Sequence, residues 1–374
     1  RDLRFDSLRG LFLVCMTVNH LPTEIRMVTD QSLGIFSAAE GFVFLSGLIA
    51  GWVYTRKFRS QGPGGLLGAS VTRASSIYWW HIGSFLAAFL FIRLTELAIG
   101  YCSPSVPKLF FEHPFEALGL GVSLLYQPGL LDLLPMYCGF VLMLPWVIRA
   151  LEAGKDWIVL SLSGAVWLAM QWAPAVDGAP LYPINTGSFN LLAWQFLFLL
   201  GVVIGHARIS GRQQVSRPSP WIIAACAAIA VYGIGIRDAN WPGLWPQGIY
   251  GVFLNKPALG LFRMADFGAV AYLVACFGAR FPRALTWRPL AFLGQHSLAV
   301  VAAQSVAILA IVPYPGLFAT AQARTATAAV VVGFLFLVAY IRQTVISHKP
   351  GRTPIQARQP GPRSLIEPDD ARAA

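Results

Sequence analysis

Two residues near the start of the chain could carry acid–base chemistry in an apolar environment. His20 lies near the end of the first apolar run, eleven residues after Arg9, and Glu40 lies early in the second run. Imidazole is the side chain best suited to proton transfer near neutral pH. A carboxylate hydrogen-bonded to it would fix its tautomer and stabilise its cation. We interpret His20 as a candidate general base and Glu40 as its partner; a histidine that only packs between helices is the structural alternative.

Several cations could hold a phosphorylated substrate. Arg9 opens the first apolar run, Arg73 begins the third, and Arg56, Lys57 and Arg59 lie between the second and third. A guanidinium group binds phosphate through parallel hydrogen bonds. Basic residues also collect on the cytoplasmic side of any membrane protein. From the residues alone, both interpretations stay open.

Further polar side chains lie within apolar stretches. Polar groups at membrane depth normally face a bundle interior or a cavity. Arg263 and Asp266 are three residues apart on one predicted helix, which favours an ion pair between them. The candidates for substrate binding are Arg9, Arg73, Tyr78, His81, Asp132, Tyr137, Gln195 and His296.

Small residues recur along the second apolar run, at Gly41, Ser46, Gly47 and Gly51. Small side chains let helix backbones approach closely. The stripe therefore predicts tight helix packing, and close approach of the backbone to a substrate is the alternative.

The chain that must position these residues is strongly apolar. Of its 374 residues, 56% are hydrophobic and only 12% are charged, and the mean hydropathy is +0.59. Soluble domains carry about 25% charged residues. Half that fraction, together with long apolar runs, predicts an all-α, polytopic integral membrane protein in a lipid bilayer. The net charge of +11 does not indicate nucleic-acid binding, because the basic residues lie in short loops and a tail.

About ten transmembrane helices are expected, since a bilayer core needs about 20 mainly apolar residues per helix. Residues 110–126 are apolar but interrupted, which predicts a re-entrant or interfacial segment. Residues 1–342 form one transmembrane domain, and residues 343–374, rich in Pro and Arg, predict a disordered cytoplasmic tail. The predicted spans are 8–25, 35–55, 74–99, 129–150, 156–173, 187–207, 219–236, 259–279, 288–312 and 326–342.

Most of the 28 Lys and Arg residues fall on one side of these spans. They lie in the N-terminal segment, in the tail, and near 56–73, 149–155, 208–217 and 280–288. The positive-inside rule makes this side, with both termini, cytoplasmic. If the first two spans form a hairpin, His20 and Glu40 share the outer half of the bilayer, whereas Arg9 lies at the inner interface.

Other chemistries lack their signatures. The five cysteines are scattered, so they predict neither a disulfide framework nor a metal site. The sequence contains no Walker A loop, HExxH, GxSxG or CxxC motif. ATP hydrolysis and zinc-dependent hydrolysis are therefore not supported.

Several motifs resemble those of a known family. The spacing Arg9-x10-His20 resembles the R-x10-H signature of the acyltransferase-3 superfamily of membrane acyltransferases. More narrowly, the chain over residues 1–342 resembles the OpgC family, succinyltransferases of osmoregulated periplasmic glucans in Gram-negative bacteria. The stretches that carry this resemblance are RDLRFDSLRG, SAAEGFVFLSGLIAGWVY, LLDLLPMY, FNLLAWQFLFLLG and LGQHSLAV.

The resemblance implies an O-succinyltransferase of the inner membrane that has no bound cofactor. Its donor substrate would be succinyl-CoA, and its acceptor a hydroxyl of a periplasmic glucan. It makes His20 the catalytic base and Arg9 its helix partner toward the donor, and it places Glu40 and Arg73 at family positions. One departure is Asn19, where many relatives are expected to carry an acidic residue.

A function of another class would use the same residues differently. His20 and Glu40 could form the proton relay of a secondary transporter or glycan exporter that performs no acyl transfer. Inverted repeats would favour a transporter, and the sequence shows no internal repeat. Acyl transfer is therefore the favoured hypothesis.

Overall fold

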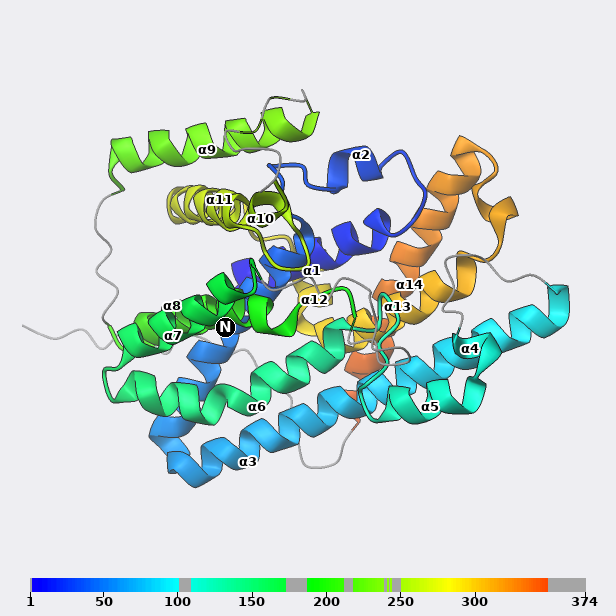
Figure 1. The fold of residues 1–374 in the computed structure, drawn as a ribbon, viewed down its shortest axis with the longest axis horizontal. Helices are drawn as coiled ribbons and strands as arrows, with labels where there is room; N and C mark the ends of the chain where they lie inside the picture. Colours follow the sequence, from blue (N-terminus) through cyan, green and yellow to red (C-terminus); the bar gives the residue numbers. More distant parts are fainter. Residues whose placement is uncertain are drawn as a thin grey trace, which may run out of the picture.

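The computed structural model is built of helices (Figure 1). It describes residues 2–100, 109–172, 187–211, 218–238, 241, 243 and 250–348, and this part of the chain forms no strand. The elements are α1 (Leu3–Asn19), α2 (Arg26–Thr29), α3 (Ala38–Ile99), α4 (Leu109–Glu112), α5 (Pro114–Val122), α6 (Leu133–Glu152), α7 (Asp156–Ala169), α8 (Leu191–Ile209), α9 (Pro220–Asp238), α10 (Tyr250–Leu254), α11 (Leu261–Arg280), α12 (Arg288–Gln295), α13 (Ser297–Ile311), a 3-10 turn (Pro315–Phe318) and α14 (Ala321–Ser347).

Six helices of the described part, α3, α6, α8, α9, α11 and α14, are long and apolar enough to cross a membrane. The pair α12 and α13 passes the same test together and would be a seventh span, although it is bent by 86°. The all-helical class and the membrane character are thus supported. The count of ten spans stays a prediction.

Helix α3 differs most from expectation. The sequence predicted two spans separated by an inner loop over 56–73, but one helix runs through 62 residues, and only Gly62, with φ 68° and ψ −173°, leaves helical geometry. Glycine adopts positive φ without steric cost. Pro63 then opens the second arm, where its missing N–H removes no helical hydrogen bond. The predicted loop is therefore wrong: α3 consists of two helical arms joined at a sharp bend (Figure 1).

The first arm of α3 packs against α8 through glycines. A Cβ on Gly47 would lie 2.1 Å from the carbonyl oxygen of Phe198, and one on Gly51 would lie 2.1 Å from that of Val202. Only glycine permits this approach at both positions. The small-residue stripe therefore serves helix packing, as predicted. Phe198 also stacks on Phe140 of α6, with ring centroids 4.9 Å apart, so α3, α6 and α8 share one core.

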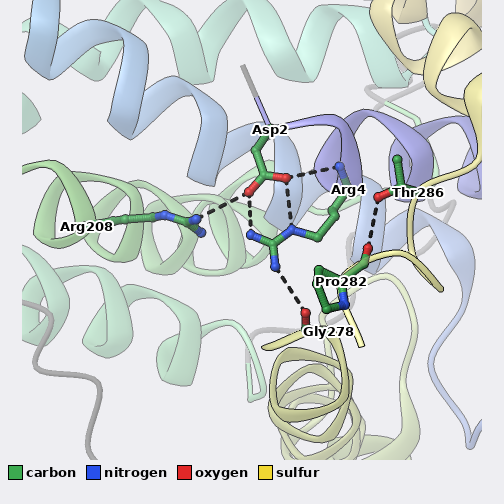
Figure 2. A network of polar contacts seen from close by, with 6 residues as sticks. All are labelled: Asp2, Arg4, Arg208, Gly278, Pro282 and Thr286. Atoms are coloured by element: carbon green, nitrogen blue, oxygen red, sulfur yellow. Dashed lines mark hydrogen bonds and ion pairs between the residues drawn. The ribbon is translucent and has the colours of Figure 1, made fainter. Parts of the chain in front are cut away.

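Segments predicted to lie on the inner side meet in one network of polar contacts (Figure 2). The Asp2 carboxylate caps α1 and accepts hydrogen bonds from Arg4 at 2.7–3.1 Å and from Arg208 at 3.3 Å. Arg4 also donates to the carbonyl of Gly278 at 3.1 Å. These contacts connect the start of α1 to the ends of α8 and α11.

The predicted outer segments meet each other in the same way. Arg324 of α14 forms an ion pair with Glu24, and Arg237 of α9 donates to the carbonyl of Gln31 at 2.7 Å. The contacts at the two ends agree with the alternation of loops expected from the sequence. The assignment of the Asp2 end to the cytoplasm stays a prediction.

The structure also shows how the segment 110–126 packs and where α14 ends. In the apolar segment 110–126, Phe110 and Ala117 are fully buried against Phe85 of α3, so α4 and α5 pack onto the helix bundle. Helix α14 continues to Ser347, five residues beyond the predicted domain end at 342. The rest of the predicted tail, 349–374, lies outside the described residues.

Candidate functional site

A cavity of about 740 Å³ lies between the two arms of α3 and is completed by α1, α6, α8 and α13. The first arm contributes a wall from Phe42 to Lys57, and the second arm contributes one from Gly65 to Ile77. Three of the predicted site residues, Arg9, Arg73 and Tyr137, line this one space. The structure thus brings together residues from three separate helices.

The cavity is cationic. Arg9, Lys57 and Arg73 line it, and its described lining includes no Asp or Glu. Lys57 and Arg73 belong to opposite arms of α3, and neither forms an ion pair within the described part of the chain. A concentration of guanidinium and ammonium groups without carboxylates attracts anions and matches phosphate chemistry.

Arg9 is held in a defined orientation. Its Nη2 donates to Ser297 Oγ of α13 at 2.5 Å, and its guanidinium lies 5.4 Å from the ring centroid of Phe42 on α3. A cation above an aromatic face is stabilised by the ring quadrupole. Both contacts fix the charge where α1, α3 and α13 meet the cavity. The importance of Ser297 was not predicted, because nothing in the sequence links it to Arg9.

Tyr137 supplies an aromatic wall. It is 8% exposed, and its ring lies edge-on to those of Phe42 and Phe198, at 6.1 and 6.3 Å. Its hydroxyl is 3.4 Å from the carbonyl oxygen of Phe42, a long hydrogen bond. The hydroxyl and ring therefore present one polar atom on an otherwise apolar wall.

His20 lies at the other end of α1, directly after the helix, and is exposed. Helix α1 ends there, earlier than the predicted boundary at 25, because the residue before Pro22 disfavours helical geometry. Eleven residues of helix separate Arg9 from His20 by about 16 Å. His20 does not line the cavity.

The side chain of Asn19 organises the segment beside His20. Its Oδ1 accepts a hydrogen bond from Thr29 Oγ1 at 2.6 Å, and its Nδ2 lies 3.4 Å from Asp30 Oδ1. Asn19 therefore connects the end of α1 to the segment that contains Thr29 and Asp30. The sequence did not reveal this, since Asp30 lies in a polar link rather than in an apolar run.

Glu40 has different partners from the one predicted. It is fully buried; its Oε2 accepts hydrogen bonds from the N–H and Oγ of Ser37, and its Oε1 accepts one from Arg263 Nε at 2.5 Å. Glu40 forms no hydrogen bond with His20, so the predicted His20–Glu40 hydrogen bond is wrong. The carboxylate caps α3 and joins it to α11.

The predicted Arg263–Asp266 ion pair is also wrong, because each side chain has a partner outside α11. Arg263 binds Glu40, and Asp266 Oδ2 instead accepts the N–H of Ile35 at 2.7 Å. Spacing along one helix identifies only neighbours on that helix. Here both side chains reach the chain segment that begins α3.

The other predicted binding residues lie outside the cavity. Tyr78 donates to the carbonyl of Val122, Asp132 accepts the N–H of Ser188, and Gln195 bonds Ser163 of α7. His81 is fully buried beside Phe85, and His296 stands at the bend between α12 and α13. Their contacts join helices to each other or to adjoining segments, and their predicted roles toward substrate stay predictions.

Comparison with known proteins adds the family. A search of curated proteins and a search of solved structures each return no match. A family model described as OpgC protein matches residues 1–346, which include His20, both arms of α3 and the whole cavity. The match covers more than nine-tenths of the chain. This membrane chain therefore belongs to the OpgC family, whose name implies an acyltransferase.

Proposed function

We propose that this protein is an inner-membrane O-acyltransferase that moves a succinyl group from cytoplasmic succinyl-CoA to a hydroxyl of a periplasmic glucan. The observation that carries the proposal is the cationic cavity between the arms of α3, in a chain of the OpgC family. A CoA thioester has phosphates at one end and a long, largely uncharged arm. The cavity offers both matching features, since cations and apolar side chains line it.

The phosphates would bind near the bend of α3, which lies toward the predicted inner end. Lys57 and Arg73 line the cavity from opposite arms of α3, and neither forms an ion pair within the described residues. Other parts of the wall are apolar and include Phe42, Phe198 and Val301. The arm would lie along these walls and pass Arg9, with its thioester directed toward the outer half.

His20 would serve as the general base. A glucan hydroxyl attacks the thioester carbon while its proton passes to the imidazole, so that a C–O bond forms and the C–S bond breaks. The departing CoA thiolate then takes the proton from the imidazolium, which regenerates the base. The exposure of His20 at the end of α1 opposite Arg9 suits an acceptor that arrives from the outer side. No covalent intermediate on the protein is needed.

The base is tested by His20→Ala and His20→Gln in purified protein in lipid, with glucan and succinyl-CoA as substrates. Loss of a general base costs about 10²- to 10⁴-fold in rate, while donor binding and thermal stability should hold. His348→Ala is the matched control, because this histidine is exposed at the end of α14, far from α1 in sequence. A stable His20→Ala protein with more than about a tenth of wild-type turnover would contradict the mechanism.

The donor site is tested by Arg73→Ala and Arg73→Lys. Removing a charged hydrogen-bond donor costs about 1.5–3 kcal/mol, so the Kd for succinyl-CoA should rise about 10- to 150-fold in Arg73→Ala, with partial recovery in Arg73→Lys. Arg93→Ala is the control, since Arg93 already pairs with Glu96 at 2.6 Å. Unchanged binding of succinyl-CoA in Arg73→Ala would show that the cavity is not the donor site. A transporter would bind no succinyl-CoA and transfer no acyl group.

A further inference from the structure

A second cavity, of about 700 Å³, lies beside the start of α1. Its lining comes from the first residues of the chain, from α3 and from the turn between α11 and α12. It is distinct from the candidate site, because the described residues that line the two cavities do not overlap. On the first arm of α3, Val53 and Lys57 line the candidate site, whereas Trp52 lines the second cavity. Neighbouring residues of an α-helix point about 100° apart, so the two cavities use different faces of this arm.

The turn between α11 and α12 forms one wall of the second cavity and is tied to α1. Thr286 Oγ1 donates to the carbonyl of Pro282 at 2.9 Å, which closes the turn (Figure 2). Ser7 Oγ of α1 accepts a hydrogen bond from the N–H of Trp287 at 3.0 Å and donates one to its carbonyl oxygen at 3.0 Å. Arg283, which lines the cavity, therefore belongs to a turn whose backbone is held in place.

The carboxylate in this lining is already neutralised. Both oxygens of Asp2 accept hydrogen bonds from Arg4, and one of them also accepts a hydrogen bond from Arg208 (Figure 2). One negative charge thus meets two positive charges. Arg283 adds a further positive charge and forms no ion pair within the described part of the chain. The cavity is therefore cationic.

Two guanidinium groups lie against the ring of Trp52. Those of Arg56 and Arg208 are 5.2 and 5.5 Å from the ring centroid. Each contact is favourable, but two like charges around one ring also raise the local positive potential, which attracts anions. Arg56, like Arg283, has no ion-pair partner among the described residues.

Exposed apolar side chains border the same cavity. Leu3, in its lining, is 41% exposed, and the turn is flanked by Phe281 and Trp287, which are 52% and 64% exposed. Tryptophan is enriched where a membrane meets water, and these segments are the ones predicted to lie on the inner side. Guanidinium groups beside exposed apolar side chains match a molecule that carries a phosphate next to hydrocarbon. Basic pockets between helices on the cytoplasmic side bind the headgroups of anionic lipids.

We propose that the second cavity binds the headgroup of an anionic phospholipid, with its phosphate diester at Arg283. The positive charges around Trp52 would offset the charge of the lipid, and Leu3 would contact its glycerol and the start of its acyl chains. A zwitterionic headgroup would bring an ammonium group into this positive field, so a phosphate diester without an amine is preferred. The inference does not depend on the proposed acyl transfer.

The test measures binding of dihexanoylphosphatidylglycerol and dihexanoylphosphatidylcholine to the full chain in uncharged detergent, by native mass spectrometry. Wild type should bind the anionic lipid more tightly. Arg283→Gln should weaken that binding about 10- to 150-fold, the range for loss of a charged hydrogen-bond donor, and Arg283→Lys should restore part of it. Arg280→Gln is the matched control, because Arg280 is exposed and contacts Phe281 at 5.5 Å but does not line the cavity. Its effect should stay within about 5-fold, as for one basic residue near a membrane surface.

Four results would overturn the inference. Equal affinity of wild type for the two lipids, or an unchanged Kd in Arg283→Gln, would show that no anionic headgroup binds there; this exposed, unpaired side chain can be replaced without loss of an internal contact. An equal effect of Arg280→Gln would assign the binding to the general positive charge of this side. Equal binding of glycerophosphoglycerol, the same headgroup without acyl chains, would make the cavity a site for a soluble phosphate diester. A parallel rise in the Kd for succinyl-CoA in Arg283→Gln would assign the cavity to the donor.

Discussion

The ion pair between Glu40 and Arg263 offers the sharpest test of how the start of α3 is held against α11. Glu40 is fully buried and Arg263 is 4% exposed, and their atoms lie 2.5 Å apart. Removal of one partner leaves the other charge buried and uncompensated, which costs about 3–5 kcal/mol. Glu40→Gln and Arg263→Met should each destabilise the protein by this amount. At about 2 °C for each kcal/mol in a large chain, the apparent Tm should fall by about 6–10 °C.

The double variant shows whether the destabilisation comes from an uncompensated buried charge. Glu40→Gln with Arg263→Met removes both charges together, and replacing a buried pair by neutral groups is often close to neutral in free energy. Its apparent Tm should therefore recover toward wild type. The measurement is thermal unfolding in lipid nanodiscs at neutral pH, followed by intrinsic tryptophan fluorescence.

A matched pair exists on the surface. Arg93 and Glu96 form a helical ion pair with side chains about 30% exposed, so Glu96→Gln should cost no more than about 1 kcal/mol. The reasoning would be refuted if Glu40→Gln shifted the Tm no more than Glu96→Gln does. It would also be refuted if the double variant were as unstable as either single one, or if Glu40→Gln changed only the pH dependence of turnover, as a direct partner of His20 would.

Three further outcomes are expected. Gly47→Leu should lower the free energy of unfolding by at least about 1–3 kcal/mol, the cost typical of overpacking, and the Tm with it, because its Cβ would lie 2.1 Å from the Phe198 carbonyl oxygen. Gly83→Ala, whose Cβ meets nothing within 4 Å, should be tolerated. The hydrogen bonds from Arg4 hold the pKa of Asp2 below its ordinary value of 3.8. The stability that the Asp2 carboxylate adds is therefore complete above pH 3.8 and is lost as pH falls through the lower folded pKa. The Tm difference between wild type and Asp2→Asn should accordingly be present at about pH 6 and vanish at strongly acidic pH. Reporter fusions after residues 178 and 211 should give opposite locations, and a shared location would refute the predicted topology.

The helices could be located from the sequence because each depends on a local property. Every predicted span overlaps a helix, since long apolar runs identify helices whatever their neighbours are. The arm junction of α3 was missed because the basic residues and Gly62–Pro63 have the composition of a loop. Only one residue there leaves helical geometry. A short polar segment between two apolar runs does not show whether a helix ends or merely bends.

The cationic part of the candidate site could be predicted, because the place of a basic residue at the start of a span is also a local property. Arg9 and Arg73 were expected at one face, from their positions at the starts of spans, and both line one cavity. The partner of Glu40 was not accessible, because Arg263 lies 223 residues away and only the packing of α11 against the start of α3 brings them together.

The bend at Gly62 also determines where the chain can change in length. The two arms of α3 form facing parts of the cavity lining, and an α-helix turns by about 100° with each residue. A residue inserted within either arm would rotate everything beyond it and turn Lys57 or Arg73 away from the shared space. At Gly62, where φ is 68° and the helical geometry is already interrupted, an added residue changes no helical phase. Length variation between relatives should therefore concentrate at this point, and a deletion or insertion elsewhere between residues 46 and 77 should abolish donor binding.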